Sequence, residues 1–176
     1  MSLLVPLTSV APSDVEALLD LAFGTDRRQR TAYQLRAGVN AIERLSFAAL
    51  EDGALVGTIQ CWPVQLTAED GTVAPLILVG PVAVHPDHQR RGIGRELMEA
   101  TLASADAAGC EPLMLIGDAI YYERFFGFTA DHTRGWILPG PVERDRLLAR
   151  LRPGQALPSH AVLEPRRAAA LVQGRD

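Results

Sequence analysis

Lysine is missing from this chain of 176 residues, so all 17 of its basic side chains are arginines. The absence excludes a phosphate-binding loop of the Walker type, a Schiff-base enzyme and a lysine general base, because each of them needs a lysine amine. Acidic residues outnumber basic ones by 21 to 17, which gives a net charge of −4. Such a chain lacks the positive surface with which most proteins bind nucleic acid or anionic membranes. We therefore expect neither of them as a partner.

Cysteine is scarce, and long apolar runs are absent. Cys61 and Cys110 are too few for a disulfide framework or a cysteine-rich zinc site. No apolar run reaches the roughly 18 residues of a membrane span. The segment Met1–Val10 lacks the basic and apolar regions of a signal peptide. These absences predict a protein of the reduced cytoplasm.

The length of the chain and its apolar fraction of 48% suit one domain with a sizeable core. No repeat or low-complexity linker divides the sequence. We expect a single domain over residues 1–163. The tail over residues 164–176 is rich in alanine and arginine, and its composition and terminal position favour disorder.

Apolar spacing, caps and turn residues predict a series of helices and strands. Ser13 and Glu16 are expected to form a capping box that opens the first helix. Asp52-Gly53 is expected at the tip of a hairpin, and Gly80-Pro81 is expected to interrupt a buried strand. The expected elements are a helix over 13–23, a second helix and a connection within 26–43, strands over 45–50, 54–62 (ended by Pro63) and 76–84, a helix over 92–108, a strand over 113–116, a helix capped by Asp118 and ending near 126, a strand from 128, a short helix over 142–151 and a strand near 161–163. This order predicts a mixed α/β layer rather than a doubly wound parallel sheet.

The segment over residues 82–95 combines features that suit an anion. A buried strand ends there, a polar turn follows, and a turn that contains Gly92 and Gly94 opens the long helix. The first amides of a helix have no partner within the helix, and the helix dipole is positive at this end. Glycine lets a phosphate approach these amides closely. Three arginines add positive charge at the same end of the helix, where it is unfavourable and where an anionic ligand would neutralise it: Arg90, Arg91 and Arg95.

A Gly-x-Gly pair alone is more often part of a solvated basic turn than of a ligand site. The strand before the pair and the helix after it favour the ligand site in this chain. The segment is not a dinucleotide-binding fingerprint, because Gly92-Ile93-Gly94-Arg95-Glu96-Leu97 lacks the third glycine and the βαβ context.

The run Gln89-Arg90-Arg91-Gly92-Ile93-Gly94 resembles motif A of the GCN5-related N-acetyltransferases (GNATs), Gln/Arg-x-x-Gly-x-Gly/Ala, at every fixed position. The strand end Val82-Ala83-Val84-His85-Pro86 and the segment Tyr121–Phe128 also resemble parts of that family. The resemblance covers about residues 3–138, with two motifs in the right order. It implies a GNAT-type mixed, mostly antiparallel central sheet flanked by helices, with a splayed central strand pair at Gly80-Pro81.

The resemblance implies an N-acetyltransferase that passes the acetyl group of acetyl-CoA to a primary amine by direct attack in a ternary complex, without a metal. In this family, amides of the motif A loop hold the pyrophosphate. The backbone of the preceding strand pairs with the pantetheine arm, and one amide polarises the thioester carbonyl. The implied cofactor-binding residues are Val82, Ala83, Val84, Gln89, Arg90, Arg91, Gly92, Ile93, Gly94 and Arg95.

The family often uses a tyrosine in the helix after the next strand as the general acid that protonates the departing CoA thiolate. Tyr121 and Tyr122 are the candidates, and we prefer Tyr122. Their side chains lie about 100° apart around a helix, so one of the two faces the thioester. Tyr122 precedes Gly127 by one residue more than the family pattern has. The other interpretation places one tyrosine in the core and the other on the surface.

No motif identifies the base that takes the proton of the amine. A water relay is one candidate, and the others are Glu69, His88, Asp118, Glu123 and His132. The shifted tyrosine and the lack of a base leave open a catalytically inactive CoA-binding sensor or interaction domain. A third interpretation is an unrelated phosphate-binding domain, such as a nucleotide binder.

The acceptor amine, on a small molecule or a peptide, is not legible from the loops that would bind it. His85-x-x-His88 is too sparse to predict a metal site. A homodimer is common for such folds, and both a monomer and a homodimer stay open.

Overall fold

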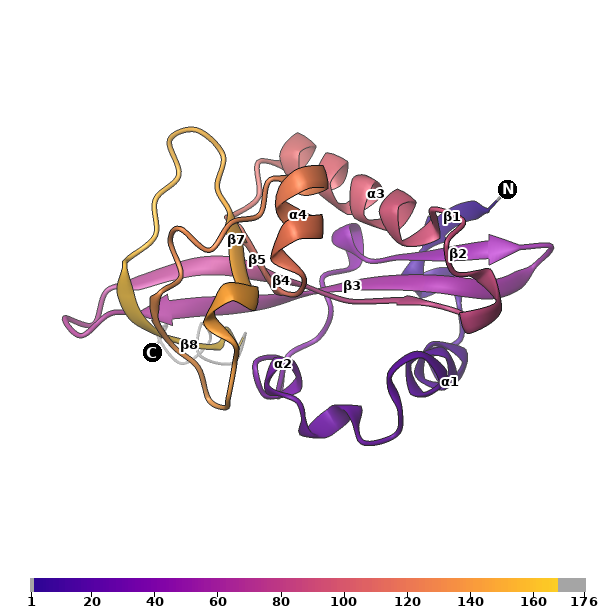
Figure 1. The fold of residues 1–176 in the computed structure, drawn as a ribbon, viewed down its shortest axis with the longest axis horizontal. Coiled ribbons are helices and arrows are strands. Elements are labelled where there is room, and N and C mark those ends of the chain that lie inside the picture. The colour runs from indigo at the N-terminus through magenta and orange to yellow at the C-terminus, as the bar shows by residue number, and fades with distance from the viewer. Residues whose placement is uncertain (1, 168–176) are drawn as a thin grey trace, which may run out of the picture. The chain divides into compact units, whose positions relative to one another are not determined.

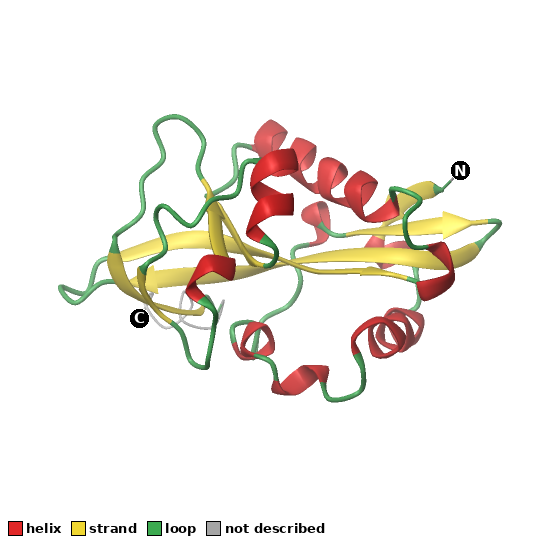
Figure 2. Cartoon of the chain, viewed as in Figure 1, coloured by secondary structure: helices red, strands yellow, loops and turns green. Residues whose placement is uncertain are grey.

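The computed structural model describes residues 2–167 as a mixed α/β fold (Figures 1 and 2). The strands are β1 (Leu3–Pro6), β2 (Phe47–Glu51), β3 (Ala54–Thr67), β4 (Val73–Val84), β5 (Leu113–Ile116), β6 (Gly135–Ile137), β7 (Leu147–Arg150) and β8 (His160–Pro165). The helices are α1 (Pro12–Phe23), α2 (Thr31–Gln34), α3 (Ile93–Ala108) and α4 (Ala119–Phe126). Short 3₁₀-helical turns lie at Leu7–Ser9, Arg27–Gln29, Glu43–Leu45, Pro86–His88 and Arg144–Arg146.

The strands pair in the order β1-β2-β3-β4-β5-β7, and β8 pairs with both β3 and β6. Among the pairs with a described register, β4–β5 and β6–β8 are parallel, and the others are antiparallel. The parallel pair β4–β5 is short, with only Ile77 opposite Leu113 and Leu78 opposite Met114. The predicted mixed, mostly antiparallel sheet with helices is confirmed.

The described chain forms two compact units, and β3 and β4 run from one into the other. The first unit comprises residues 2–28, 41–61 and 79–110, and the second comprises 29–40, 62–78 and 111–167. The first unit therefore holds α1, α3, β1, β2 and the adjoining parts of β3 and β4. The second unit holds α2, α4 and the remaining strands.

In the first unit the β2–β3 hairpin turns at Asp52 and Gly53, whose φ angles of 50° and 79° are both left-handed. This pair of positive φ angles is typical of the predicted two-residue hairpin turn. In Figure 1, α1 and α3 lie on opposite faces of these strands. Buried side chains of α1 (Val15, Leu18 and Leu19) pack with Ala83 of β4.

The predicted capping box at the start of α1 is wrong. The helix begins at Pro12, and its N-cap is Ala11, which has no side-chain cap bond. Proline is well suited to the first helical position because its φ is already helical and it has no amide to leave unpaired. Glu16 is therefore not needed as a cap.

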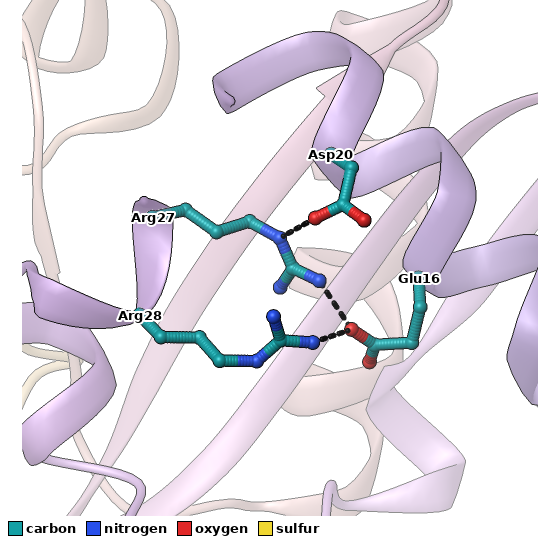
Figure 3. Close-up of polar contacts among 4 residues, drawn as sticks. All are labelled: Glu16, Asp20, Arg27 and Arg28. Atoms are coloured by element: carbon teal, nitrogen blue, oxygen red, sulfur yellow. Dashed lines mark hydrogen bonds and ion pairs between the residues drawn. The ribbon is translucent and has the colours of Figure 1, made fainter. Parts of the chain in front are cut away.

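Glu16 instead helps to hold the segment that follows α1 (Figure 3). The fully buried Arg27 donates from Nε to Asp20 Oδ1 at 2.9 Å, and its Nη2 pairs with the Glu16 carboxylate. Arg28 Nη2 donates to the same carboxylate at 3.0 Å. These ion pairs hold the chain beyond Gly24 against the helix. The second helix expected within 26–43 is present only as short turns and the four-residue α2.

In the second unit, the predicted short helix over 142–151 is wrong. Its apolar residues form β7, which pairs antiparallel with β5 along its whole length and is buried at Leu147, Leu148 and Ala149. A short apolar run has no period that separates a strand from a helix, so its partner strand decides. The strand expected from Phe128 is a single bridge between Thr129 and Ala149.

Two strands extend further than the sequence predicts. Pro63 lies inside β3, where its carbonyl accepts from the Arg166 amide at 3.1 Å, so the predicted break at Pro63 is wrong. Strand β8 includes Glu164 and Pro165, which belong to the expected tail. The tail from residue 168 lies outside the described residues. No helix in the described part of the chain has the length and apolar character needed to cross a membrane.

Candidate functional site

The end of β4 and the start of α3 form one continuous turn in the first unit. The His85 amide donates to the Val56 carbonyl of β3 at 2.8 Å, which fixes the end of β4 in the sheet. His85 Nδ1 then accepts from the Asp87 amide at 3.1 Å and caps the Pro86–His88 turn. The chain therefore leaves the sheet in a defined direction before it reaches motif A.

Two left-handed residues shape the motif A loop. Arg90 has a φ of 67° and Gly92 has a φ of 82°. A Cβ on Gly92 would have no heavy atom within 4 Å, so glycine is favoured there by the backbone angle and not by crowding. A left-handed arginine is uncommon and costs about 1 kcal/mol or more. Such backbone strain tends to occur at ligand-binding sites.

The amides at the start of α3 are available to a ligand. Gly92 provides no side-chain cap, and the Glu96 amide donates to the Gly92 carbonyl at 3.0 Å. Within residues 2–167 the amides of Gly92, Ile93 and Gly94 have no acceptor. Unpaired amides at the positive end of a helix dipole attract an anion, as the sequence predicts.

Close packing brings this helix end against the end of β4. A Cβ on Gly94 would lie 3.6 Å from Val84 Cγ2 and 3.9 Å from Val82 Cγ1. The structure therefore places two sets of the predicted cofactor-binding residues, the strand end over 82–84 and the glycine turn, next to each other. Both sets belong to the first unit.

The arginines of the loop remain on the surface. Arg91 Nη1 lies 3.5 Å from Glu51 Oε2, and Arg95 Nε donates to Glu99 Oε1 at 3.0 Å. Arg90 is exposed and has no ion pair with any residue of the described chain. Exposed ion pairs are weak, so these cations can turn to a phosphate group at small cost.

Sequence analysis missed Gly57, which sets how closely α3 approaches the sheet. A Cβ on Gly57 would lie 2.8 Å from Ile93 Cγ2, 3.1 Å from Leu97 Cδ1 and 3.3 Å from the Ala83 carbonyl oxygen. Its φ is not left-handed, so the close approach of the helix alone requires glycine. A glycine inside a strand pattern was the available signal.

The two candidate tyrosines lie on α4 in the second unit. As predicted, Asp118 caps this helix, since its Oδ1 accepts from the amides of Ile120 at 2.9 Å and Tyr121 at 3.2 Å. Gly127 ends the helix with a left-handed φ of 74°. The expected helix and both of its ends are confirmed.

Tyr122 packs against Gly117 and Phe128. A Cβ on Gly117 would lie 2.5 Å from Tyr122 Cε2, so the tyrosine ring lies directly over that glycine, a second residue that sequence analysis missed. The Tyr122 ring also contacts Phe128, with 6.3 Å between ring centroids. Burial raises the pKa of Tyr122, and the neighbouring Tyr121 adds to the rise. The Tyr122 hydroxyl makes no hydrogen bond to a described residue.

No candidate base stands out. Asp118 is occupied as a cap, and His88 Nδ1 lies 2.7 Å from Glu51 Oε2. The other three candidates are exposed: Glu69, Glu123 and His132. Burial raises the pKa of the Cys61 thiol well above its usual range, which disfavours the thiolate that a nucleophilic cysteine needs. Within residues 2–167, no group of three or more His, Cys, Asp or Glu side chains could hold a metal ion.

Solved structures with this fold include two GNAT proteins. A GNAT family acetyltransferase from Brucella melitensis, in complex with acetyl-CoA, matches with a TM-score of 0.62 and 26% identity, over 97% of this chain and 98% of that one. The GNAT family N-acetyltransferase YhbS from Escherichia coli, in complex with CoA, matches with a TM-score of 0.69 and 23% identity, over 94% of this chain and 89% of that one.

Sequence comparisons agree with the fold. An uncharacterised N-acetyltransferase of Escherichia coli strain K12, YjhQ, is 26% identical over 134 residues, which cover 76% of this chain and 73% of that protein. An uncharacterised N-acetyltransferase of Streptomyces avermitilis is 30% identical over 97 residues, 54% of this chain but 23% of that longer protein. The family described as the acetyltransferase (GNAT) domain matches residues 6–130, well over half of the chain. The chain therefore belongs to the GNAT family of acetyltransferases.

Proposed function

We propose that this GNAT protein transfers the acetyl group of acetyl-CoA to a primary amine by direct attack in a ternary complex. One observation carries the proposal: the amides of Gly92, Ile93 and Gly94 have no acceptor in the described chain, and they lie against the strand end over 82–84. The Brucella melitensis relative, in complex with acetyl-CoA, supports the same cofactor.

The pyrophosphate of the cofactor would accept hydrogen bonds from the amides of the motif A loop. The side chains of Arg90, Arg91 and Arg95 would neutralise its charge. Strand β4 continues for six residues after Leu78, the last residue in register with β5, so its backbone over 82–84 has an edge on which an extended pantetheine arm can pair. An amide of this edge would donate to the thioester carbonyl as its oxygen becomes negative.

The amine nitrogen then attacks the carbonyl carbon, so a C–N bond forms and the C–S bond breaks. Tyr122 would donate its hydroxyl proton to the departing sulfur and regain a proton from solvent. The attacking nitrogen loses one proton, which a water relay can carry away. The products are the N-acetyl amine and CoA thiol, and the charges balance.

The cofactor site is tested by calorimetry with acetyl-CoA. Gly92→Glu places a carboxylate among the amides that would hold the pyrophosphate, and we expect binding to weaken on the order of 100-fold. Gly109→Glu is the matched control, because Gly109 is also left-handed, with a φ of 63° and no heavy atom near its Cβ, but caps the opposite end of α3. Equal affinity of the Gly92→Glu variant and the unmodified protein would contradict the proposal.

Turnover separates the enzyme from a CoA-binding protein without activity. Release of CoA thiol is measured with a panel of a polyamine, an amino acid, an aminoglycoside and a peptide with a free N-terminus. Thiol release above background with any of these amines supports the transferase. Binding of acetyl-CoA with no release across the panel would favour the inactive CoA-binding sensor.

A further inference from the structure

Strand β3 buries two polar atoms that have no partner in the described chain. Thr58 Oγ1 and Gln60 Oε1 are both inaccessible to solvent, and no hydrogen bond reaches either of them. The exposed fraction is 0% for Thr58 and 7% for Gln60. Buried polar groups are nearly always satisfied, so an unpaired pair calls for a partner from outside the chain.

Both side chains lie on the face of β3 opposite α3. Gly57 faces α3, because its Cβ position lies against Ile93 and Leu97. Cys61 lies on the same side, where it interacts with Thr101 of α3. Since successive side chains of a strand alternate between faces, Thr58 and Gln60 lie on the other face, where α1 packs.

This face adjoins the segment proposed to hold the acetyl-pantetheine. The His85 amide donates to the Val56 carbonyl, and the Cβ position of Gly57 lies 3.3 Å from the Ala83 carbonyl oxygen. Thr58 is therefore level with the strand end over 82–84 on the adjacent strand. Ala83 itself packs on the α1 side. An acceptor group held by Thr58 would lie beside the thioester.

The two unpaired atoms select the chemistry of their partner. The amide oxygen of glutamine can only accept a hydrogen bond, whereas the hydroxyl of threonine can either donate or accept one. The partner of Gln60 Oε1 must therefore present at least one N–H or O–H group, which an ionised carboxylate lacks. Residues two apart on a strand are separated by about 6.6 Å, and two acceptors of one tetrahedral nitrogen lie about 4.7 Å apart, a difference that the long glutamine side chain can close. A primary amine has enough N–H donors to satisfy both atoms.

We propose that Thr58 and Gln60 bind the amine nitrogen of the acceptor, with Gln60 Oε1 and Thr58 Oγ1 both accepting from its N–H groups. This inference rests on the proposed function and adds to it the residues that recognise the amine.

Two substitutions of similar shape test the pair, Thr58→Val and Gln60→Met. We expect each to raise the KM for the amine about tenfold or more, since a hydrogen bond to a charged group is lost, and to leave the KM for acetyl-CoA unchanged. Each variant keeps or raises the Tm, because an unpaired buried polar group has been removed. The matched control is Thr101→Val, a fully buried threonine whose hydroxyl already donates to the Leu45 carbonyl at 3.0 Å. It should lower the Tm by about 2–4 °C and leave the KM for the amine unchanged.

Calorimetric titration of the amine panel into the protein saturated with CoA gives a readout without turnover. Loss of amine binding in Thr58→Val and Gln60→Met, with CoA binding intact, supports the site even if no acetyl transfer occurs. Transfer with an unchanged KM for the amine in both variants would overturn the site and leave the transferase standing. A fall of Tm in both variants with unchanged amine binding would also overturn it, because the pair would then hold only a structural water. Failure of every amine of the panel to bind the unmodified protein overturns the site as well.

Discussion

At the scale of single residues, burial keeps Tyr122, the acid that we propose, in its protonated form. Tyr122 packs over Gly117, and burial raises the pKa of its hydroxyl above the usual value. The hydroxyl therefore keeps its proton throughout the neutral range and is always in the form that can donate. Tyr121 has its ring against Phe125, Phe126 and Tyr122, in an aromatic cluster on α4.

Tyr122→Phe is expected to lower kcat by about 10²-fold or more, the typical contribution of a general acid, with little change in the KM for acetyl-CoA. The kcat of the unmodified enzyme should show no decline from tyrosine ionisation below about pH 10, because the folded-state pKa lies above the ordinary value. Steady-state kinetics across the alkaline range measure both effects.

Tyr121→Phe is the matched control, one residue away on the same helix, and should retain turnover. If Tyr121→Phe loses activity and Tyr122→Phe does not, the roles are reversed. Full activity in both variants would remove tyrosine from the mechanism.

At the scale of elements, one glycine governs how α3 lies on the sheet. Gly57→Ala adds a methyl 2.8 Å from Ile93 Cγ2 and 3.3 Å from the Ala83 carbonyl, one of which must shift. We expect a loss of about 1–3 kcal/mol in the free energy of unfolding, the usual effect of overpacking. Because Ile93 is the first residue of α3, acetyl-CoA binding should weaken too. Urea unfolding and calorimetry measure the two effects.

Gly57→Val extends the series and should be worse than Gly57→Ala in both measurements. An alanine variant with unchanged stability and affinity would mean that α3 can move away freely, and that its contact with β3 does not position the motif A loop.

Elements with strong local signals could be predicted from the sequence. Helix α3 combines apolar periodicity with glycine at both ends, and the β2–β3 hairpin turns at Asp52-Gly53, so the helix and the position of the turn are confirmed. The capping box failed because Pro12 started α1 one residue earlier. Strand β7 was expected to be helical because its apolar run, over residues 147–149, is too short to show a period, and its pairing with β5 decides its structure.

In the candidate site, too, the residues with local signals were predicted, and those that depend on distant contacts were missed. The motif A loop was predicted because its chemistry comes from the local backbone, which glycine and helix position encode. Gly57 and Gly117 were missed, since each is required by a side chain distant in the sequence or on the next helix. Thr58 and Gln60 were missed for a related reason. The sequence does not show whether a polar side chain in a strand has a hydrogen-bond partner in the folded chain.

At the scale of the whole molecule, the absence of lysine shapes how this acetyltransferase can be studied. Lysine side chains are the usual targets of unwanted acetylation by acetyl-CoA, and this chain has none. A change of its thermal stability in the presence of acetyl-CoA therefore measures binding, with no contribution from acetylated lysine side chains. Apart from histidine, the cationic side chains that could bind the cofactor are all arginines, which keep their charge at all accessible pH values.

Binding to the native state alone raises its stability by mass action. At a CoA concentration about 100 times the Kd, the gain is about 2.7 kcal/mol. For a chain of this size, each kcal/mol shifts the Tm by about 2–4 °C, so we expect CoA to raise the Tm by about 5–11 °C. Thermal unfolding with and without CoA measures the shift, and Gly109→Glu should keep it while Gly92→Glu loses it. A shift of the same size with ATP at the same concentration would contradict a site built for CoA. The loop would then recognise only the phosphates, because ATP lacks the pantetheine arm that we propose to pair with β4.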